Sequence, residues 1–141
     1  MSTLDKAIRI AAIAHEGQID KGGNPYILHP LRVMMRLYEH TDDIKIVAVL
    51  HDVFEDCDVS VRDLEEEGFS KTIIDAIVAL TRRKDETYMD FIKRVKNNPI
   101  AKLVKIADIE DNMNLMRIPE PTENDYERNK RYHKALDYLL S

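Results

Sequence analysis

The stretch AVLHDVFEDCD, residues 48–58, places one histidine and four carboxylates among apolar side chains. If this stretch is one helix, His51 and Glu55 lie one turn apart, and so do Asp52 and Asp56. The apolar residues before and between them predict that the helix is otherwise packed. Because isolated charges in such surroundings cost several kcal/mol or more, the pattern predicts either basic partners or a divalent cation.

Two further segments carry side chains that could bind the same cation. No basic residue occurs between Lys45 and Arg62, so the stretch cannot pair its charges locally. His29 stands just before Pro30, at the expected start of a helix. Asp108, with Asp111 and Asn112, interrupts the apolar face of LVKIADIEDNMNLM. Two histidines and two aspartates form a mixed nitrogen and oxygen set, which suits Mn²⁺, Fe²⁺ or Zn²⁺ better than Ca²⁺ or Mg²⁺.

Spacing alone leaves a second interpretation open. A histidine next to an aspartate on a helix is commonly a surface or capping pair, and EDCD could be the solvated end of a helix. Distance along the sequence does not establish that three separate segments converge. The metal site is therefore one of two hypotheses at this point.

The apolar periodicity is helical almost throughout, and no segment alternates as a strand would. The expected helices begin behind capping residues or at prolines. They start near residue 4, at Pro30 (to about Tyr38), behind Thr41–Asp43 (including 48–58), behind Ser60, near 71–83 and 88–97, at Pro99, and behind Thr122 or Asn124. The sequence predicts one all-α domain of seven or eight helices over residues 1–141.

Composition limits the class of partner and the location. The formal net charge is -5 and the basic residues are scattered, so we expect no nucleic-acid partner. No apolar run approaches the ~20 residues that cross a bilayer, and the N-terminus lacks the features of a signal peptide. Cys57 is the only cysteine, which fits a reducing compartment. We expect a cytoplasmic protein that does not contact membranes.

The segments AHEGQIDKGGNPYILHP, LHDVFED and KLVKIADIEDNM resemble the HD-domain metal-dependent phosphohydrolases. Among these phosphohydrolases, the chain is most similar to the (p)ppGpp hydrolase domains of the RelA/SpoT type and to the small alarmone hydrolases. The resemblance extends from about Leu4 to Arg117. This resemblance implies a compact HD-domain bundle and removal of the 3′-pyrophosphate from (p)ppGpp or a related alarmone such as (p)ppApp. It implies Mn²⁺, or another divalent transition metal, bound by His29, His51, Asp52 and Asp108.

The resemblance also implies roles for five other residues. Glu55 and Asp56 act on the attacking water, Lys21 lies near the phosphates, and Asn112 lies near the ribose. Tyr26 belongs to the same loop as Lys21 and is expected either to contact substrate or to pack.

Several positions depart from the family pattern. Asp20 stands where alarmone hydrolases commonly have an arginine that stacks on the base, and a carboxylate cannot stack in that way. Leu115 replaces a hydroxyl residue, and Ile109 and Glu110 follow the metal-binding aspartate in place of Arg or Lys. These departures leave the expected metal centre intact and alter the expected nucleotide contacts.

Alternative functions follow from these departures. The chain could be an HD phosphohydrolase acting on another nucleotide, such as a nucleoside phosphate or NADPH. It could be a catalytically silent nucleotide-binding regulatory module, or a helical interaction protein whose acidic cluster is incidental. We expect a small-molecule nucleotide as substrate, and a monomer or homodimer.

Overall fold

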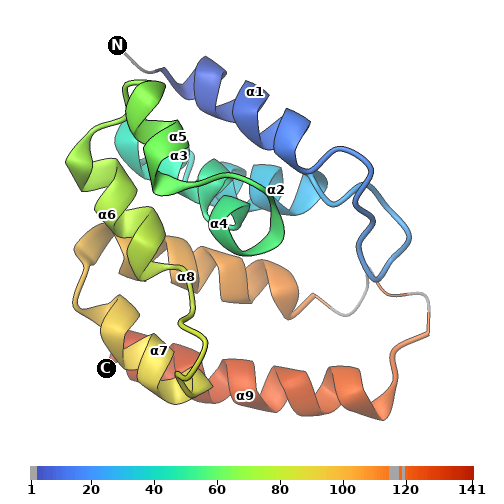
Figure 1. The fold of residues 1–141 in the computed structure, drawn as a ribbon. Helices are drawn as coiled ribbons and strands as arrows, with labels where there is room; N and C mark the ends of the chain where they lie inside the picture. Colours follow the sequence, from blue (N-terminus) through green and yellow to red (C-terminus); the bar gives the residue numbers. More distant parts are fainter. Residues whose placement is uncertain (1–2, 115–117, 119) are drawn as a thin grey trace.

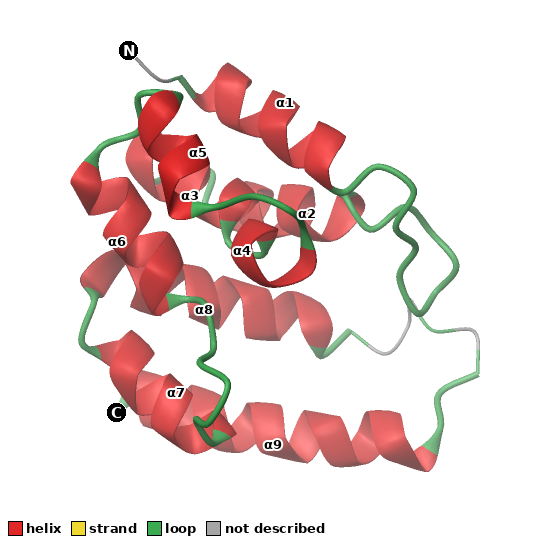
Figure 2. Cartoon of the chain, in the orientation of Figure 1, coloured by secondary structure: helices red, strands yellow, loops and turns green. Residues whose placement is uncertain are grey.

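The computed structural model describes residues 3–114, 118 and 120–141 (Figure 1). These residues form no strand, and their helices are joined by loops and turns (Figure 2). The helices are α1 (Leu4–Ala14), α2 (Leu28–Arg36), α3 (Asp42–Leu50), α4 (Val53–Asp56), α5 (Val61–Glu66), α6 (Lys71–Ala79), α7 (Tyr88–Lys96), α8 (Pro99–Asn112) and α9 (Glu123–Leu140). The all-α prediction is confirmed. No helix in the described part of the chain is both long and apolar enough to cross a membrane.

Two helices organise the bundle. The last five residues of α3 are all buried, because α3 lies against α1, α2, α6 and α8. Helix α8 lies against α2, α3, α6, α7 and α9, so it runs through the middle of the molecule with α9 on its outer side (Figure 1). The core therefore surrounds the C-terminal end of α3 and the length of α8.

The stretch 48–58 differs from the single helix that was expected. Helix α3 ends at Leu50, His51 and Asp52 form a turn, and one short helical turn, α4, follows. The His51 ring Nδ1 lies 2.6 Å from the backbone oxygen of Ala48, which turns the ring back toward α3. This break adds a helical segment to the seven or eight expected. It also brings the side chains of His51 and Asp52 together, with Nε2 and Oδ2 3.1 Å apart.

The loop between α1 and α2 folds back on itself. An isolated bridge joins Ile19 to Pro25. One oxygen of Asp20 accepts hydrogen bonds from the backbone N–H groups of Gly22 and Asn24, each at 2.9 Å. Gly23 has a φ of 83°, a conformation that favours glycine. The loop is thus held by its own backbone, and it leads directly into the first turn of α2.

Helix α2 starts earlier than the expected Pro30. Its first residue is Leu28, so His29 lies in the first helical turn, where its side chain is buried. Helix α6 ends at Ala79 and not near 83, because the next residues form polar contacts of their own. Glu55 accepts a hydrogen bond from the backbone N–H of Arg82, and Glu86 accepts one from that of Arg83.

A neighbouring pair of leucines near the C-terminus tests where α9 meets the core. Leu139 is 0% exposed and Leu140 is 66% exposed. We expect Leu139→Ala to lower the free energy of unfolding by about 2–5 kcal/mol, because it removes a buried side chain and leaves a cavity. Leu140→Ala should change it by about 0.5 kcal/mol or less. Urea unfolding of both variants measures this, and equal losses would contradict the packing of α9.

Candidate metal centre

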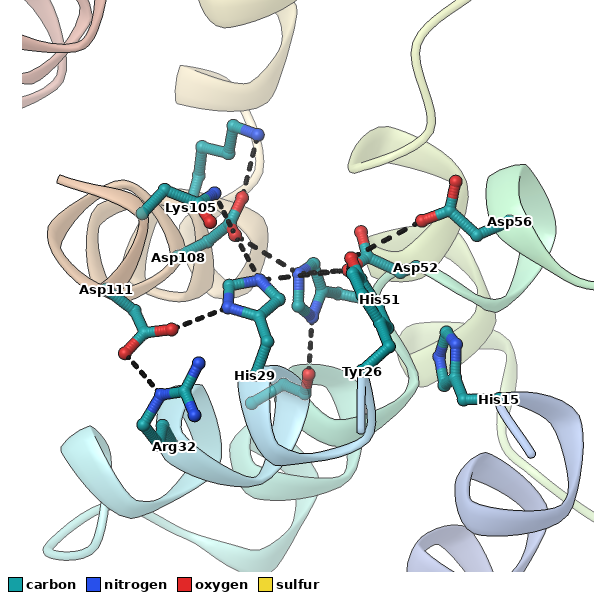
Figure 3. A network of polar contacts seen from close by, with 12 residues as sticks. His15, Tyr26, His29, Arg32, His51, Asp52, Asp56, Lys105, Asp108 and Asp111 are labelled. Carbon is teal, nitrogen blue, oxygen red and sulfur yellow. Dashed lines mark hydrogen bonds and ion pairs between the residues drawn. The ribbon is translucent and has the colours of Figure 1, made fainter. Parts of the chain in front are cut away.

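Donor atoms from three separate segments meet between α2, α8 and the turn after α3 (Figure 3). His29, His51 and Asp108 each offer a donor atom, and these atoms lie within 4.8 Å of one another. Asp52 extends the group, because its Oδ2 lies 3.1 Å from His51 Nε2 and 3.8 Å from His29 Nε2. The structure thus brings together the two histidines and two aspartates that sequence spacing could not place.

The hydrogen bonds of His51 leave one ring nitrogen facing negative charge. Because Nδ1 lies against the Ala48 carbonyl oxygen, the neutral ring carries its hydrogen on Nδ1 and has a lone pair on Nε2. This buried Nε2 has no hydrogen-bond partner among the described residues. It faces carboxylate oxygens of Asp52 and Asp108 at 3.1 and 3.4 Å. A lone pair between two carboxylates requires a positive charge, either a proton or a metal ion, so the donor set fits a divalent cation.

His29 is held in the corresponding way from the opposite side. Its Nδ1 lies 2.6 Å from Asp111 Oδ2, and its Nε2 lies 2.9 Å from Asp108 Oδ1. With the hydrogen on Nδ1, the lone pair of Nε2 also points toward the shared centre. The two imidazoles and two carboxylates therefore present electron pairs to one region.

Two neighbours on α8 fix Asp108. Lys105 Nζ lies 2.9 Å from Asp108 Oδ2, and the side-chain amide of Asn112 donates to Oδ1 at 3.0 Å. Lys105 is the basic partner that the local sequence around His51 lacked. Asn112, expected near a ribose, contacts a carboxylate of the centre, and it also lines the adjoining cavity.

The titration of the central groups reflects this crowding of charge. Burial opposes charge on His51, but the carboxylates of Asp52 and Asp108 outweigh it and raise its pKa well above the ordinary 6.5. Burial also favours the protonated form of Asp108, yet Lys105 and His51 hold its pKa well below the ordinary 3.8. The carboxylates are therefore ionised and available to a cation, while the imidazoles hold protons that a cation would displace.

A tyrosine and two further carboxylates flank the centre on the side of α4. The hydroxyl of Tyr26 donates to Asp52 Oδ2 at 2.6 Å and lies 3.4 Å from Asp56 Oδ2. The Tyr26 ring packs between the rings of His15 and His29. Glu55 is held by the backbone of Arg82. Tyr26 thus orients a donor carboxylate, whether or not it also contacts a substrate.

Burial raises the pKa of both flanking carboxyl groups. For Asp56 the nearby charge of Asp52 adds to the effect of burial. For Glu55 burial outweighs the hydrogen bond from Arg82, and Asp52 again contributes. A carboxylate with a raised pKa accepts a proton more readily at neutral pH than an ordinary one.

A cavity of about 280 Å³ opens beside the centre. Lys21 stands on its rim with a side chain that is 61% exposed, 3.8 Å from Asp125 Oδ1. Arg128 contacts the same carboxyl group. The polar and aromatic residues that line the cavity are Asp20, Lys21, Tyr26, His29, Asn112, Arg128 and Tyr132. A cavity with cations at its rim and aromatic rings in its wall can hold an anionic, ring-bearing ligand.

Sequence analysis did not assign Lys105, Asp111, Arg128 or Tyr132 to the site. Lys105 and Asp111 lie three residues on either side of Asp108, on the same face of α8, so helical spacing could have suggested them. Arg128 and Tyr132 lie on α9, and no local pattern links that helix to the cavity. Leu115, one of the departures from the family pattern, lies outside the described residues.

Several curated proteins are similar in sequence to this chain over most of its length. A guanosine-3′,5′-bis(diphosphate) 3′-pyrophosphohydrolase of Vibrio cholerae is 32% identical over 133 residues, covering 86% of this chain and 19% of that protein. A probable GTP pyrophosphokinase of Mycobacterium leprae is 31% identical over 131 residues, covering 86% of this chain and 17% of that protein. The chain thus spans less than a fifth of the length of these relatives. No family model matches the chain.

A solved structure has the same fold. It is described as a metazoan ortholog of SpoT that hydrolyses ppGpp. Its TM-score is 0.79 at 23% sequence identity, and the match covers 99% of this chain and 86% of that chain. The predicted compact helical bundle of the HD-domain type is therefore confirmed at the level of fold.

The raised histidine pKa values give the binding of metal a definite pH dependence. In the metal-free protein, protonated His29 and His51 stabilise the fold below the ordinary pKa of 6.5, and this contribution is lost as the pH rises through the raised values. Metal needs the unprotonated nitrogens, so the affinity for Mn²⁺ should increase from about pH 6 to about pH 8 with release of protons.

Calorimetry in buffers of different ionisation enthalpy counts the protons released on binding. His133→Gln, which changes an exposed histidine on α9, should leave the pH dependence as in the wild type. An affinity for Mn²⁺ that does not change over this pH range would contradict the protonated state of the imidazoles.

Proposed function

The chain belongs to the RelA/SpoT-type HD hydrolase family, and from this premise we propose that it is a metal-dependent phosphohydrolase. Residues 1–141 act as one HD phosphohydrolase domain that removes the 3′-pyrophosphate of (p)ppGpp or of a related alarmone such as (p)ppApp. The observation that carries the proposal is the set of four donor atoms beside a cavity with cations at its rim.

His29, His51, Asp52 and Asp108 would hold the metal, with Mn²⁺ as the proposed ion. When bound, a divalent cation lowers the pKa of a water molecule and offsets negative charge on phosphoryl oxygens. Two residues that are not ligands hold ligand side chains in place. Tyr26 holds Asp52 through its hydroxyl, and Lys105 holds the second oxygen of Asp108.

Glu55 and Asp56 are the proposed proton acceptors for the attacking water. One oxygen of Glu55 is fixed by the Arg82 backbone, which leaves the other to accept a proton. Asp56 Oδ2 lies 3.4 Å from the Tyr26 hydroxyl, whose one hydrogen goes to Asp52. The raised pKa of each carboxyl group suits proton transfer near neutral pH. Attack of water on phosphorus and cleavage of the bond to the 3′ oxygen then give pyrophosphate and a nucleotide with a free 3′ hydroxyl.

The cavity supplies contacts for the nucleotide. Lys21 and Arg128 can pair with phosphate oxygens in place of Asp125, and Tyr132 offers a ring face to the base or sugar. Asn112 is the proposed contact to the ribose, and Tyr26 a further one to the substrate. The chemistry of the cavity favours a small-molecule nucleotide over a nucleic acid.

A different nucleotide is the second candidate substrate, and the contacts of Asp20 favour this alternative. One carboxylate oxygen of Asp20 binds backbone N–H groups of its own loop, so this position supplies no cation to stack on guanine. A nucleoside phosphate or NADPH would use the same metal and the same proton acceptors. A silent nucleotide-binding module would have no use for Glu55 and Asp56.

Location and assembly are part of the proposal. A cytoplasmic location agrees with Cys57 as the only cysteine. The proposed state is a monomer or a homodimer.

Two acidic residues on α8 provide a test of the ligand assignment. We expect Asp108→Ala to abolish retention of Mn²⁺, because it removes a donor and leaves Lys105 unpaired. Glu110→Ala, which removes an exposed carboxylate two residues away, should retain metal like the wild type. Asp52→Ala should also lose the metal. Elemental analysis of dialysed protein measures metal per chain, and wild-type retention in Asp108→Ala would refute the assignment.

Turnover should be measured with Mn²⁺ against (p)ppGpp, (p)ppApp, nucleoside phosphates and NADPH, following pyrophosphate and phosphate separately. We expect pyrophosphate from an alarmone. Glu55→Ala should keep its metal and lose about 10²–10⁴-fold in rate, because it lacks a proton acceptor. Absence of turnover on every nucleotide, with metal bound, would contradict the enzymatic function and favour the silent module.

A further inference from the structure

A chain of polar contacts leads from the centre to the outer side of α2. Asp111 lies on α8, is 1% exposed, and uses its two oxygens for different partners. Its Oδ2 lies 2.6 Å from His29 Nδ1, and its Oδ1 accepts a hydrogen bond from Arg32 Nε at 2.9 Å. Arg32 is one turn after His29 on α2, so α2 grips Asp111 at two points. Figure 3 shows the three side chains in a row that ends at the metal centre.

This row has a consequence for His29. In the metal-free protein both ring nitrogens of His29 face ionised carboxylate oxygens, which accept and cannot donate, so the protonated ring donates to Asp111 from Nδ1 and to Asp108 from Nε2. A metal ion that displaces the proton of Nε2, the nitrogen 2.9 Å from Asp108 Oδ1, leaves the remaining hydrogen on Nδ1, where it faces Asp111. A carboxylate behind a metal-binding imidazole also makes that imidazole a stronger ligand.

Arg32 has a separate effect in the same row. A buried carboxylate without a cation is costly, and Asp111 lies close to a centre that already contains Asp52 and Asp108. The guanidinium of Arg32 offsets this third negative charge and holds the Asp111 carboxyl group in one orientation. Arg36 approaches the same oxygen only to 4.0 Å, at the limit of an ion pair.

We propose that Asp111 and Arg32 are positioning residues that fix His29 with its hydrogen on Nδ1 and so direct Nε2 toward the metal. The proposal rests on the role of His29 as a ligand in the proposed function. Neither Asp111 nor Arg32 contacts the substrate cavity or the attacking water in this account. Their effect passes through His29 alone.

The first test measures the affinity for Mn²⁺ by calorimetry. We expect Asp111→Asn to bind Mn²⁺ about 10–100-fold more weakly, in line with the loss of outer contacts in other metal sites. Arg32→Gln should weaken binding in the same direction. Because both act through His29, the double variant should lose less than the product of the two single losses. Arg36→Gln, the same type of change on the same helix, should bind like the wild type.

A second measurement separates positioning from a merely structural clamp between α2 and α8. Histidine labelled with ¹⁵N reports by NMR which ring nitrogen carries the hydrogen in protein loaded with Zn²⁺. We expect Nδ1–H at His29 in the wild type and a mixture of tautomers in Asp111→Asn. A clamp would lower the free energy of unfolding without changing the tautomer.

Nε2–H at His29 in the wild type loaded with Zn²⁺, or unchanged affinity for Mn²⁺ in both single variants, would overturn the positioning role. Wild-type protein that binds no Mn²⁺ would overturn the ligand assignment and the positioning role with it. Failure to hydrolyse any nucleotide, with the expected affinities and tautomer, would refute the proposed reaction alone.

Discussion

The structure is organised around one electrostatic constraint, the close approach of two imidazoles and two carboxylates in the interior. Their electron pairs point at one another, with His51 Nε2 only 3.1 Å from an oxygen of Asp52. Such an arrangement is stable only with positive charge at its centre. The break after α3, the early start of α2 and the placement of α8 all serve to bring these groups together. Around these four residues, Lys105, Tyr26 and Asp111 bind atoms of Asp108, Asp52 and His29 respectively. These contacts hold the donor side chains in fixed orientations.

Much of the fold could be predicted from periodicity and caps. Helix α5 begins behind Ser60, as the capping pattern predicted. The turn at His51 could not be predicted, because the apolar spacing continues through it. The His51 ring there contacts the backbone oxygen of Ala48, and α3 ends at Leu50. The four proposed ligands could be named from the sequence, largely through family resemblance, but their convergence depends on how α2, α3 and α8 pack.

The site has two parts, the donor set of His29, His51, Asp52 and Asp108 (the metal half) and the adjoining cavity (the nucleotide half). These parts differ in how closely they follow the family pattern. The metal half keeps every donor that the resemblance implied, and the contacts behind those donors are well formed. In the nucleotide half, Asp20 serves the backbone of its own loop, and the rim cations Lys21 and Arg128 share Asp125. In the proposed function, the reaction depends on the residues around the metal centre and the choice of substrate on the residues around the cavity.

The most direct test of the central claim is the position of the ion itself. Anomalous diffraction at the manganese edge, from crystals grown with Mn²⁺, locates the metal without reference to activity. The account predicts one strong peak about 2 Å from His29 Nε2, His51 Nε2 and oxygens of Asp52 and Asp108, the usual distance for such ligands. A peak elsewhere, or none in crystals that contain ordered His29 and His51, would contradict the claim that a metal ion holds this centre together.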